Sequence, residues 1–369
     1  MILKGKDLDY VVNRLNGYYG SFDRIDTYFR ERKKQRLDKL PMSLFSIDDD
    51  LFSDFSMSPE DMNFELVDLP YGQWDNYLEH ISSHSNDINP GKSMPIAVRE
   101  TNTGKYVGFI RLGSPTINSK PRNVLFGEVP PLDKVNKHII MGFVIVPTQP
   151  FGFNYLGGKL LSLICCSHEV RQKMNEKWDS DICMFETTSL YGSIKAASQY
   201  DGLKPFIRYR GDTESKFLLT MSDEIYKELN AFFIEKNDGN PLIHKEASSR
   251  KLKTQTKMIS ITKASLKESG RTDDYDEFVG FLKHAQGLTT KKRAYTTDFG
   301  FANTVDYILG KDDKLIKKDN YDRYSLDNLV TWWKNKATNR YNNLVADGRL
   351  RTEMEIWDAN KMDAIDIIR

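Results

Sequence analysis

The sequence is poor in cysteine and in long hydrophobic runs, and both absences narrow the class of protein. Its three cysteines form no Cys-x-x-Cys pair. We therefore expect reduced, structural thiols of a cytoplasmic protein, and a catalytic cysteine is the less favoured interpretation. No apolar stretch approaches the roughly 20 residues that cross a bilayer, and the N-terminus lacks the apolar core of a signal peptide. The sequence predicts a soluble intracellular chain without a membrane partner.

Several catalytic and metal-binding signatures are also absent. The chain contains no Gly-x-Ser-x-Gly elbow, no His-Glu-x-x-His and no convincing Cys–His pair. His138 and His168 are isolated from such patterns. The acidic run that begins at Asp48 lacks the glycine and the ligand spacing of a calcium loop. No metal is expected.

An excess of charge of one sign is missing as well. The chain has 53 Lys and Arg against 52 Asp and Glu, which gives a formal net charge of +1. Any contact with nucleic acid must therefore come from local clusters of basic residues. One such cluster runs from Arg24 to Lys39. One interpretation is a patch that contacts phosphates. The interpretation that we favour is the solvated face of a helix.

What is present supports a well-packed protein. Hydrophobic residues make up 39% of the 369 residues and aromatic residues 12%, enough for a substantial core in two or three domains. We predict four parts: a basic helical arm and acidic linker at 1–63, an α/β domain at 64–215, a connecting helix at 216–244, and a helical, locally basic C-terminal domain at 245–369.

Alternating apolar residues predict a mixed sheet in the second part, hence the fold class α/β (α+β). Two of the strands flank Asn102-Thr-Gly104, which is typical of a hairpin. A long helix connects two later strands, and Ser114–Lys137 looks irregular. The predicted strands are 64–69, 95–100, 105–112, 138–146, 181–188 and 207–210, and the predicted helices are 74–81 and 154–178. Beyond Gly211, helices are predicted at 223–235, 275–286 and 326–347, with a basic linker at Ser248–Lys253.

The strongest candidate for a ligand site is the start of the helix after Asn154. Its residues Tyr155, Leu156, Gly157, Gly158 and Lys159 follow a strand and a turn rich in proline and glycine. Because the first amides of a helix lack internal partners, this order of elements can cradle a phosphate. The glycines let the backbone approach closely, and Lys159 adds a charge. Alternatively, the glycines only allow tight packing of the helix on the sheet. The spacing is neither that of a Walker loop nor Gly-x-Gly-x-x-Gly.

The order of hairpin, strand, turn, Leu-Gly-Gly-Lys-Leu-Leu helix and further strand resembles the GNAT acyltransferase fold. In that family the corresponding loop and helix start bind the pyrophosphate of an acyl-CoA-type cofactor through backbone amides. The usual motif, Arg/Gln-x-x-Gly-x-Gly/Ala, is replaced here by Asn154-Tyr-Leu-Gly-Gly-Lys159. The resemblance implies acyl-CoA or a related nucleotide-linked donor at Tyr155–Lys159.

About residues 140–211, roughly a fifth of the chain, are also similar to the Druantia DruA-type domain. They are similar, more distantly, to the phage Mom enzymes that modify adenine in DNA. The residues that carry this similarity are Val144-Ile-Val-Pro147, Asn154–Leu161, Phe185-Glu-Thr-Thr188, Tyr191-Gly-Ser193 and Gln199-Tyr-Asp-Gly202. The similarity implies a phage or anti-phage setting, the host cytoplasm if the chain is phage-encoded, and a nucleic-acid target such as DNA.

Acyl transfer to an amine needs a base for the amine proton and an acid for the leaving thiolate. Glu186, at the end of an apolar strand, is the candidate base, and Tyr191 or Tyr200 is the candidate acid. Partial burial of Glu186 would raise its pKa toward the range that a base needs. The alternative is a structural ion pair between Glu186 and Arg208 or Arg210.

Aromatic residues interleaved with basic ones are candidates for nucleic-acid binding, because they combine phosphate contacts with stacking. Two stretches fit: Arg208, Tyr209 and Arg210, and the helical residues Lys334, Lys336 and Arg340 near Trp332, Trp333 and Tyr341. Adjacent helical residues point about 100° apart, so one of the two tryptophans is expected to anchor the helix on the core.

Together these features predict a phage-type, nucleic-acid-directed acyl transferase of GNAT-like fold, which modifies a DNA base. The alternative is a non-catalytic nucleic-acid-binding or phage–host interaction protein on the same fold. A structural virion component has no positive sign in the sequence.

Overall fold

The computed structural model describes residues 1–38, 40, 47–83, 91–214, 219–247, 249–360 and 365. The chain divides into two compact units. The helical unit consists of Met1–Arg32 and Glu214–Lys291, and the sheet unit consists of Lys33–Thr213 and Lys292–Arg369. This division differs from the four consecutive parts predicted above, because segments far apart in the sequence pack together. Lys39 and Ser248, predicted in a basic run and a linker, lie outside the described residues.

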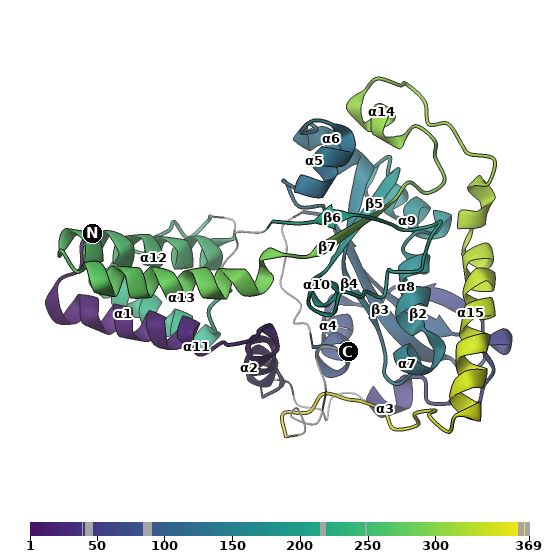
Figure 1. Cartoon of the computed structure of the whole chain (residues 1–369), viewed down its shortest axis with the longest axis horizontal. Helices are drawn as coiled ribbons and strands as arrows, with labels where there is room; N and C mark the ends of the chain where they lie inside the picture. Colours follow the sequence, from purple (N-terminus) through teal and green to yellow (C-terminus); the bar gives the residue numbers. More distant parts are fainter. Residues whose placement is uncertain are drawn as a thin grey trace. The chain divides into compact units, whose positions relative to one another are not determined.

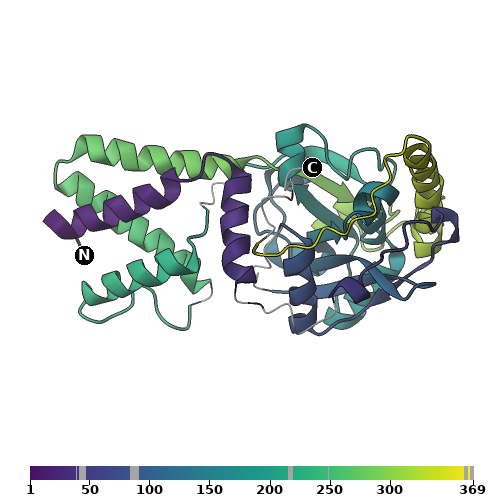
Figure 2. The same cartoon turned by 90° about the horizontal axis from the view of Figure 1, so that it is seen from below.

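Four helices make up most of the helical unit (Figures 1 and 2): α1 (Gly5–Gly20), α11 (Asp223–Glu235), α12 (Arg250–Glu268) and α13 (Thr272–Thr290). α1 contacts each of the other three. Its buried residues recur at the spacing of one helix face: Leu8, Val11, Val12, Leu15, Tyr18 and Tyr19. The N-terminal segment is therefore part of a helix bundle and not a separate arm. Most of the predicted linker at Ser248–Lys253 is the first turn of α12.

The sheet unit is built on a seven-stranded mixed sheet with the order β1-β2-β3-β4-β5-β7-β6. Neighbouring strands are antiparallel except for β4 and β5, which are parallel. The strands are β1 (Phe64–Val67), β2 (Ser93–Glu100), β3 (Lys105–Gly113), β4 (Ile139–Pro147), β5 (Met184–Ser189), β6 (Arg208–Asp212) and β7 (Arg293–Thr297). The prediction of a mixed sheet with an antiparallel start and a helical crossover is confirmed.

The strand β7 corrects the prediction of a helical C-terminal domain. It inserts between β5 and β6, with Thr297 opposite Phe185 and Thr296 opposite Arg208. Residues 292–369 therefore belong to the sheet unit, while α12 and α13 belong to the helical unit. The segment was missed because its five residues lack the apolar alternation of the other strands.

Helices cover both faces of the sheet. α4 (Tyr71–Ile81) packs on one face, where its Trp74 and Tyr77 lie in a cluster with Phe109 and Val144. The opposite face carries the main core, which includes Ile110 and residues of four helices. They are α7 (Phe151–Tyr155), α8 (Gly157–Ile164), α9 (His168–Trp178) and α15 (Leu326–Ala346). No helix in the described part of the chain is long and apolar enough to cross a membrane.

The single helix predicted at 154–178 is in fact three helices. Leu156 adopts a left-handed conformation with φ 55° and separates α7 from α8. Ser167 then caps α9, since its side chain accepts a hydrogen bond from the amide of Val170. A sequence pattern does not reveal a left-handed leucine, because this conformation is uncommon outside glycine, asparagine and aspartate.

Two segments predicted as irregular are ordered. The acidic segment before β1 contains α3 (Ile47–Asp50) and a 3-10 turn, Pro59–Asp61, and it buries Leu51, Phe52, Phe55 and Met62. It is therefore part of the core and not a flexible linker. The proline-containing segment 114–137 holds α5 (Lys120–Phe126) and α6 (Leu132–His138). Pro121 and Pro131 stand at the starts of these two helices, where a proline does not break the helix. The remaining elements are α2 (Ile25–Leu37), α10 (Leu190–Lys195), α14 (Thr304–Leu309) and the 3-10 turn Tyr321–Tyr324.

One tryptophan of the adjacent pair anchors α15, as predicted. Trp333 is buried, and its indole N–H donates a hydrogen bond of 2.9 Å to the carbonyl of Tyr155. Its ring also lies against Phe64 and Phe151. Trp332 is only half-buried.

We expect Trp333→Ala to lower the free energy of unfolding of the sheet unit by about 3–5 kcal/mol, because it empties a buried site and leaves a carbonyl unpaired. Trp332→Ala is the matched control and should cost roughly 1 kcal/mol. Urea denaturation monitored by circular dichroism measures both. Equal losses for the two variants would show that Trp333 is not the anchor.

Candidate active site where two parallel strands separate

The sheet opens where β4 and β5 separate. Their pairing runs from Ile139 opposite Met184 to Gly142 opposite Thr187, and the structure describes no pair beyond it. β4 continues along β3 to Pro147, with a bulge at Phe143 that shifts the register. In sheets with parallel strands, ligands bind at the carboxyl ends of strands where neighbouring connections diverge. The carboxyl end of the β4–β5 pair, called the split below, is therefore the candidate site.

The predicted phosphate cradle lies beside this split, at the start of α8. Gly157 and Gly158 are the first two residues of the helix, and Leu156 supplies no side-chain cap. Both glycines are buried. A Cβ on Gly157 would lie 2.6 Å from Cδ1 of Phe151, and one on Gly158 would meet the side-chain oxygen of Gln199. Close packing thus requires both glycines, as the alternative interpretation held.

A loop, Ser198–Gly202, covers the start of α8. The side-chain amide of Gln199 donates a hydrogen bond of 3.1 Å to the carbonyl of Ile145 on β4. The ammonium of Lys159 donates to the carbonyls of Gln199 and Asp201. Burial lowers the pKa of Lys159, an effect that Asp201 opposes. In this conformation the loop, and not a ligand, holds the Lys159 ammonium.

The loop is tied to β7. The carboxylate of Asp201 accepts hydrogen bonds from Nη1 of Arg293 at 3.0 Å and from the Tyr295 hydroxyl at 2.9 Å. The ring of Tyr295 also lies 5.0 Å from that of Tyr200. Access to the split from this side requires the loop to move away from these partners.

Tyr155 does not face the cradle with its side chain. The ring is fully buried, it stacks on Tyr341 with centroids 5.3 Å apart, and its hydroxyl donates to the carbonyl of Met57. Its carbonyl accepts from the indole N–H of Trp333, and the amide of Leu156 donates to the carbonyl of Gly152. A ligand at this helix start would therefore have to use the amides of Gly157 and Gly158.

Glu186 forms a buried ion pair, but with a residue that the sequence did not indicate. Its Oε1 accepts a hydrogen bond of 2.9 Å from Nη1 of Arg122 on α5. Nη2 of Arg122 is fixed by the carbonyls of Thr116 and Ile117. The predicted alternative, a pair between Glu186 and a β6 arginine, is wrong because β7 lies between β5 and β6. Arg208 is exposed, and Arg210 donates to Thr296 instead.

The Glu186 carboxyl retains one oxygen for chemistry. Within the described residues, Oε2 accepts no hydrogen bond, and 9% of the side chain is exposed. Burial raises the pKa of Glu186, and the charge of Arg122 opposes that shift. A carboxylate in this setting is fixed in orientation and has an increased tendency to take a proton.

The two candidate acids lie on different sides of the sheet. The Tyr200 hydroxyl is 3.3 Å from Oγ1 of Thr187, which donates to the carbonyl of Gly142. Consecutive strand residues point to opposite faces, so Tyr200 is across the sheet from Glu186. Burial raises the pKa of Tyr200 to about 12. The Tyr191 hydroxyl lies 3.0 Å from Oγ of Ser83, directly after α4, which covers the face of Glu186.

The residues predicted to bind nucleic acid are partly or fully accessible. Arg208 and Tyr209 are exposed on β6, at one edge of the sheet, and the Arg293 guanidinium lies 4.8 Å from the centre of the Tyr209 ring. Burial lowers the pKa of Arg210. On α15, Lys336 is exposed, whereas Lys334 and Arg340 are half-buried.

The cysteines and the two histidines contribute no reactive centre. Cys165, Cys166 and Cys183 are free and buried, and burial raises their pKa values. Burial lowers the pKa of His138 and of His168. The described residues contain no group of His, Cys, Asp and Glu arranged to hold a metal ion.

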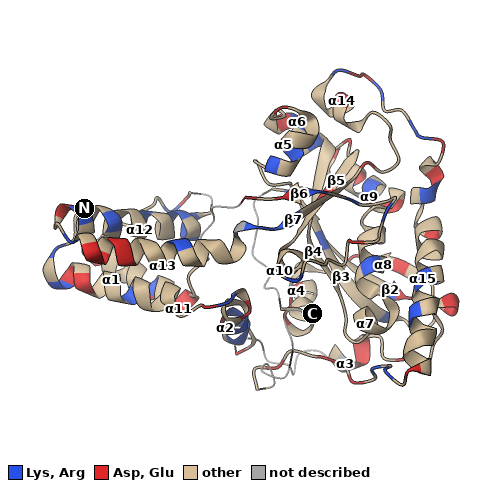
Figure 3. Cartoon of the chain, viewed as in Figure 1, with Lys and Arg blue, Asp and Glu red and all other residues tan. Residues whose placement is uncertain are grey.

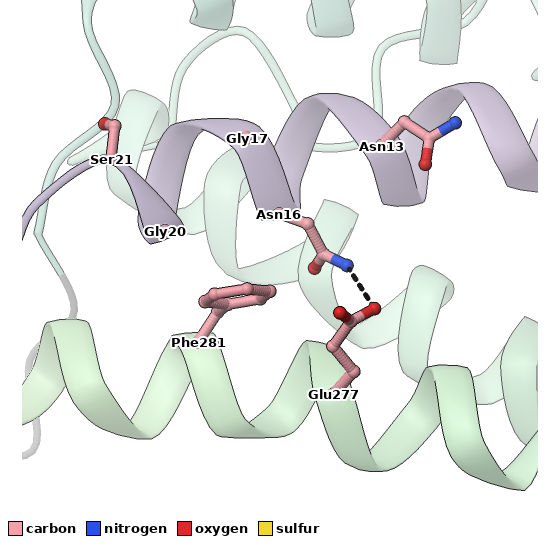
Figure 4. A pocket seen from close by; sticks show the side chains of 7 residues that line it. All are labelled: Asn13, Asn16, Gly17, Gly20, Ser21, Glu277 and Phe281. Carbon is pink, nitrogen blue, oxygen red and sulfur yellow. Dashed lines mark hydrogen bonds between the residues drawn. The ribbon is translucent and has the colours of Figure 1, made fainter.

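A separate hollow of about 440 Å³ lies in the helical unit, between α1 and α13 (Figure 4). Its lining residues are Asn13, Asn16, Gly17, Gly20, Ser21, Glu277 and Phe281. Glu277 is the one titratable group among them, and Asn16 donates to it at 3.5 Å. The hollow therefore offers one carboxylate and no second titratable side chain among its lining residues.

Sequence reasoning missed Arg122, and it gave no role of their own to Gln199 and Asp201, which it named only within Gln199-Tyr-Asp-Gly202. Arg122 follows Pro121, and Gly127 ends the same short helix in a left-handed conformation, which together are a helix signal. The contacts of Gln199 and Asp201 connect segments about 40 to 95 residues apart, and no local pattern reports them.

We expect Arg122→Met to destabilise the fold by about 3–5 kcal/mol at pH 8, because it leaves the Glu186 carboxylate buried without a counter-charge. The pKa of Glu186 is raised in the folded state, so the protonated form favours folding. Its contribution is full below the unfolded pKa, about 4.3, and is lost as the pH rises through the folded value. The loss of stability should therefore be smaller at pH 5 than at pH 8.

Urea denaturation at both pH values measures this effect. The matched control is Arg122→Met combined with Glu186→Gln, in which the pH-dependent part of the loss should disappear. A loss for Arg122→Met that is the same at pH 5 and pH 8 would contradict the assigned role of the pair.

Comparison with known protein families gives no match to this chain, and comparison with curated proteins gives none either. The geometry of the split is therefore the basis on which a function is proposed.

Proposed function

We propose that this chain is a GNAT-like transferase that moves an acyl group from acyl-CoA, or a related nucleotide-linked donor, to a base of DNA. The observation that carries the proposal is the split between β4 and β5, with α8 starting at the carboxyl end of β4 and Glu186 on β5. The same order of elements underlies the resemblance to GNAT enzymes and to the DruA-type and Mom domains. That resemblance also favours a phage or anti-phage setting in the cytoplasm.

The donor would bind at Tyr155–Lys159. In this stretch the amide of Leu156 donates to the carbonyl of Gly152, and that of Lys159 donates to the carbonyl of Leu156. The amides of Gly157 and Gly158 would therefore hold the phosphate, which the helix dipole favours there. Binding requires Gln199 to leave the carbonyl of Ile145, and it requires the Lys159 ammonium to exchange two loop carbonyls for an anion. The anion compensates Lys159 better than neutral carbonyls do, because it is charged.

In the transfer step, the acceptor amine attacks the thioester carbonyl. A C–N bond forms, and the C–S bond breaks. Oε2 of Glu186 takes the amine proton directly or through a water, while Arg122 holds the carboxylate in place. The leaving thiolate takes a proton from a hydroxyl; of the two candidates, Tyr191 lies on the side of Glu186 and Tyr200 on the other. The products are the acylated base and the free thiol.

The acceptor strand would lie along β6. Arg208 and Arg293 contact phosphates, and Tyr209, 46% exposed, offers a stacking surface for an extruded base. One strand, β7, separates this edge of the sheet from β5, which carries Glu186.

The proposal predicts that CoA raises the melting temperature of the full chain, because a ligand that binds only the folded state stabilises it. Glu186→Gln should keep this shift and lose roughly 10²–10⁴-fold in rate. The rate is measured by mass spectrometry of nucleosides from DNA incubated with acyl-CoA. Glu176→Gln, an exposed glutamate on α9, is the matched control. Full turnover by Glu186→Gln would exclude Glu186 as the base, and absence of both shift and turnover in the parent chain would exclude the transferase.

A second candidate is a nucleic-acid-binding protein on the same fold without a donor site. The observation that favours it is the closed loop Ser198–Gly202, with Lys159 and Gln199 already paired. Such a protein binds DNA in a salt-dependent way and shows no shift with CoA.

Either candidate requires the β6 edge. We expect Arg208→Ala combined with Tyr209→Ala to weaken binding of a labelled DNA duplex by about tenfold at 0.15 M salt, through loss of one phosphate contact and one stacking surface. Fluorescence anisotropy measures the affinity. Lys137→Ala, an exposed cation on α6, is the control. Unchanged affinity in the double variant would remove this edge from the interface.

A further inference from the structure

A second cationic surface lies on α15 and the segment that follows it. Residues 328–346 contain no Asp or Glu, and Figure 3 shows the Lys and Arg residues along this helix. The exposed side chains of this stretch include four amides and one cation. They are Asn335, Lys336, Asn339, Asn342 and Asn343. A helix face without acids, rich in amides and basic residues, is complementary to a polyanion.

Two arginines share one aromatic ring at this surface. Cζ of Arg340 lies 4.7 Å from the centre of the Phe153 ring, and Cζ of Arg351 lies 3.8 Å from the same centre. The two guanidinium groups are thus no farther apart than the sum of these distances. Nε of Arg340 also donates to the carbonyl of Phe153 at 3.4 Å. The ring and the carbonyl fix both cations in adjacent positions.

These cations are only partly compensated. Arg351 is 3.6 Å from Glu355, and Arg349 pairs with Asp347. Neither Arg340 nor Lys336 has a carboxylate partner within the described residues; Lys336 instead lies over the Trp332 ring at 4.8 Å. Burial, Arg349 and Arg351 lower the pKa of Arg340. Holding like charges this close is unfavourable, and an external anion offsets that cost.

We propose that Lys336, Arg340 and Arg351, the two arginines held against the Phe153 ring, bind the phosphodiester backbone of duplex DNA, with the asparagine amides of α15 directed at its groove. Lys336 and Arg340 are one helical turn apart, about 6 Å along the axis. A row of cations that extends along a helix fits a repeating anion better than a single phosphate. Amide side chains supply the donor and acceptor pairs that read base edges. This inference rests on the proposed function only for DNA as the acceptor.

The test measures the affinity of the full chain for a labelled duplex over a range of salt concentrations, without CoA. The variants are Arg351→Ala, whose side chain is half-exposed, and Arg340→Ala with Arg351→Ala. We expect the double variant to bind about tenfold more weakly at 0.15 M salt and its log–log salt slope to fall by about 2, one for each lost phosphate contact. Arg340→Lys with Arg351→Lys should recover most of the slope. Lys137→Ala is the control, and circular dichroism checks folding.

An unchanged salt slope in Arg351→Ala and in the folded double variant would overturn the inference. So would loss of the CoA-induced shift with DNA affinity retained, because the arginines would then bind the phosphates of the donor. The two proposals can fail separately. DNA binding that depends on Arg340 and Arg351, in a parent chain that transfers no acyl group, supports this inference and contradicts the transferase.

Discussion

The insertion of β7 between β5 and β6 is the constraint on which most of the candidate site depends. It places Tyr295 opposite Thr187 and Arg293 beside Tyr209. It also brings Arg293 and Tyr295 to Asp201, which fixes the loop over α8. Because β7 separates β6 from β5, the arginines of β6 lie one strand away from Glu186. The counter-charge of Glu186 comes instead from Arg122 on α5.

The pairing of β4 and β5 shows how a regular ladder is made to end. Thr187 donates its hydroxyl to the carbonyl of Gly142, the last residue of β4 that faces β5. The bulge at Phe143 then turns β4 away, since an unpaired residue increases the local twist. Beyond this point the carbonyl of Ile145 lacks a strand partner on that side and is satisfied by Gln199. A buried carbonyl needs such a partner, which explains why the loop sits in the split.

Local pattern predicted the parts of this fold that local physics determines. The hairpin of β2 and β3 follows from its alternation around Asn102-Thr-Gly104, and the parallel pair follows from two apolar strands joined by helices. The ends of the chain could not be assigned in this way. β7 has five residues with no apolar alternation, and its partners lie more than 80 residues away in the sequence. The left-handed Leu156, the pair of Glu186 with Arg122, and the ring shared by Arg340 and Arg351 all depend on tertiary contacts that no spacing encodes.

The opposite orientation of Glu186 and Thr187 sets a geometric requirement on any transfer reaction here. The start of α8 and the loop lie on the face of Thr187, whereas the carboxylate lies on the face covered by α4 and α5. An intact ladder would keep a donor at α8 away from that carboxylate, because a paired sheet leaves no passage. Under the proposed function, a donor anchored at α8 has to reach Glu186 past the end of this ladder, where β4 and β5 separate after Gly142 and Thr187. In the structure the Gln199 side chain occupies this place, bonded to the carbonyl of Ile145, so the proposed reaction requires that side chain to move.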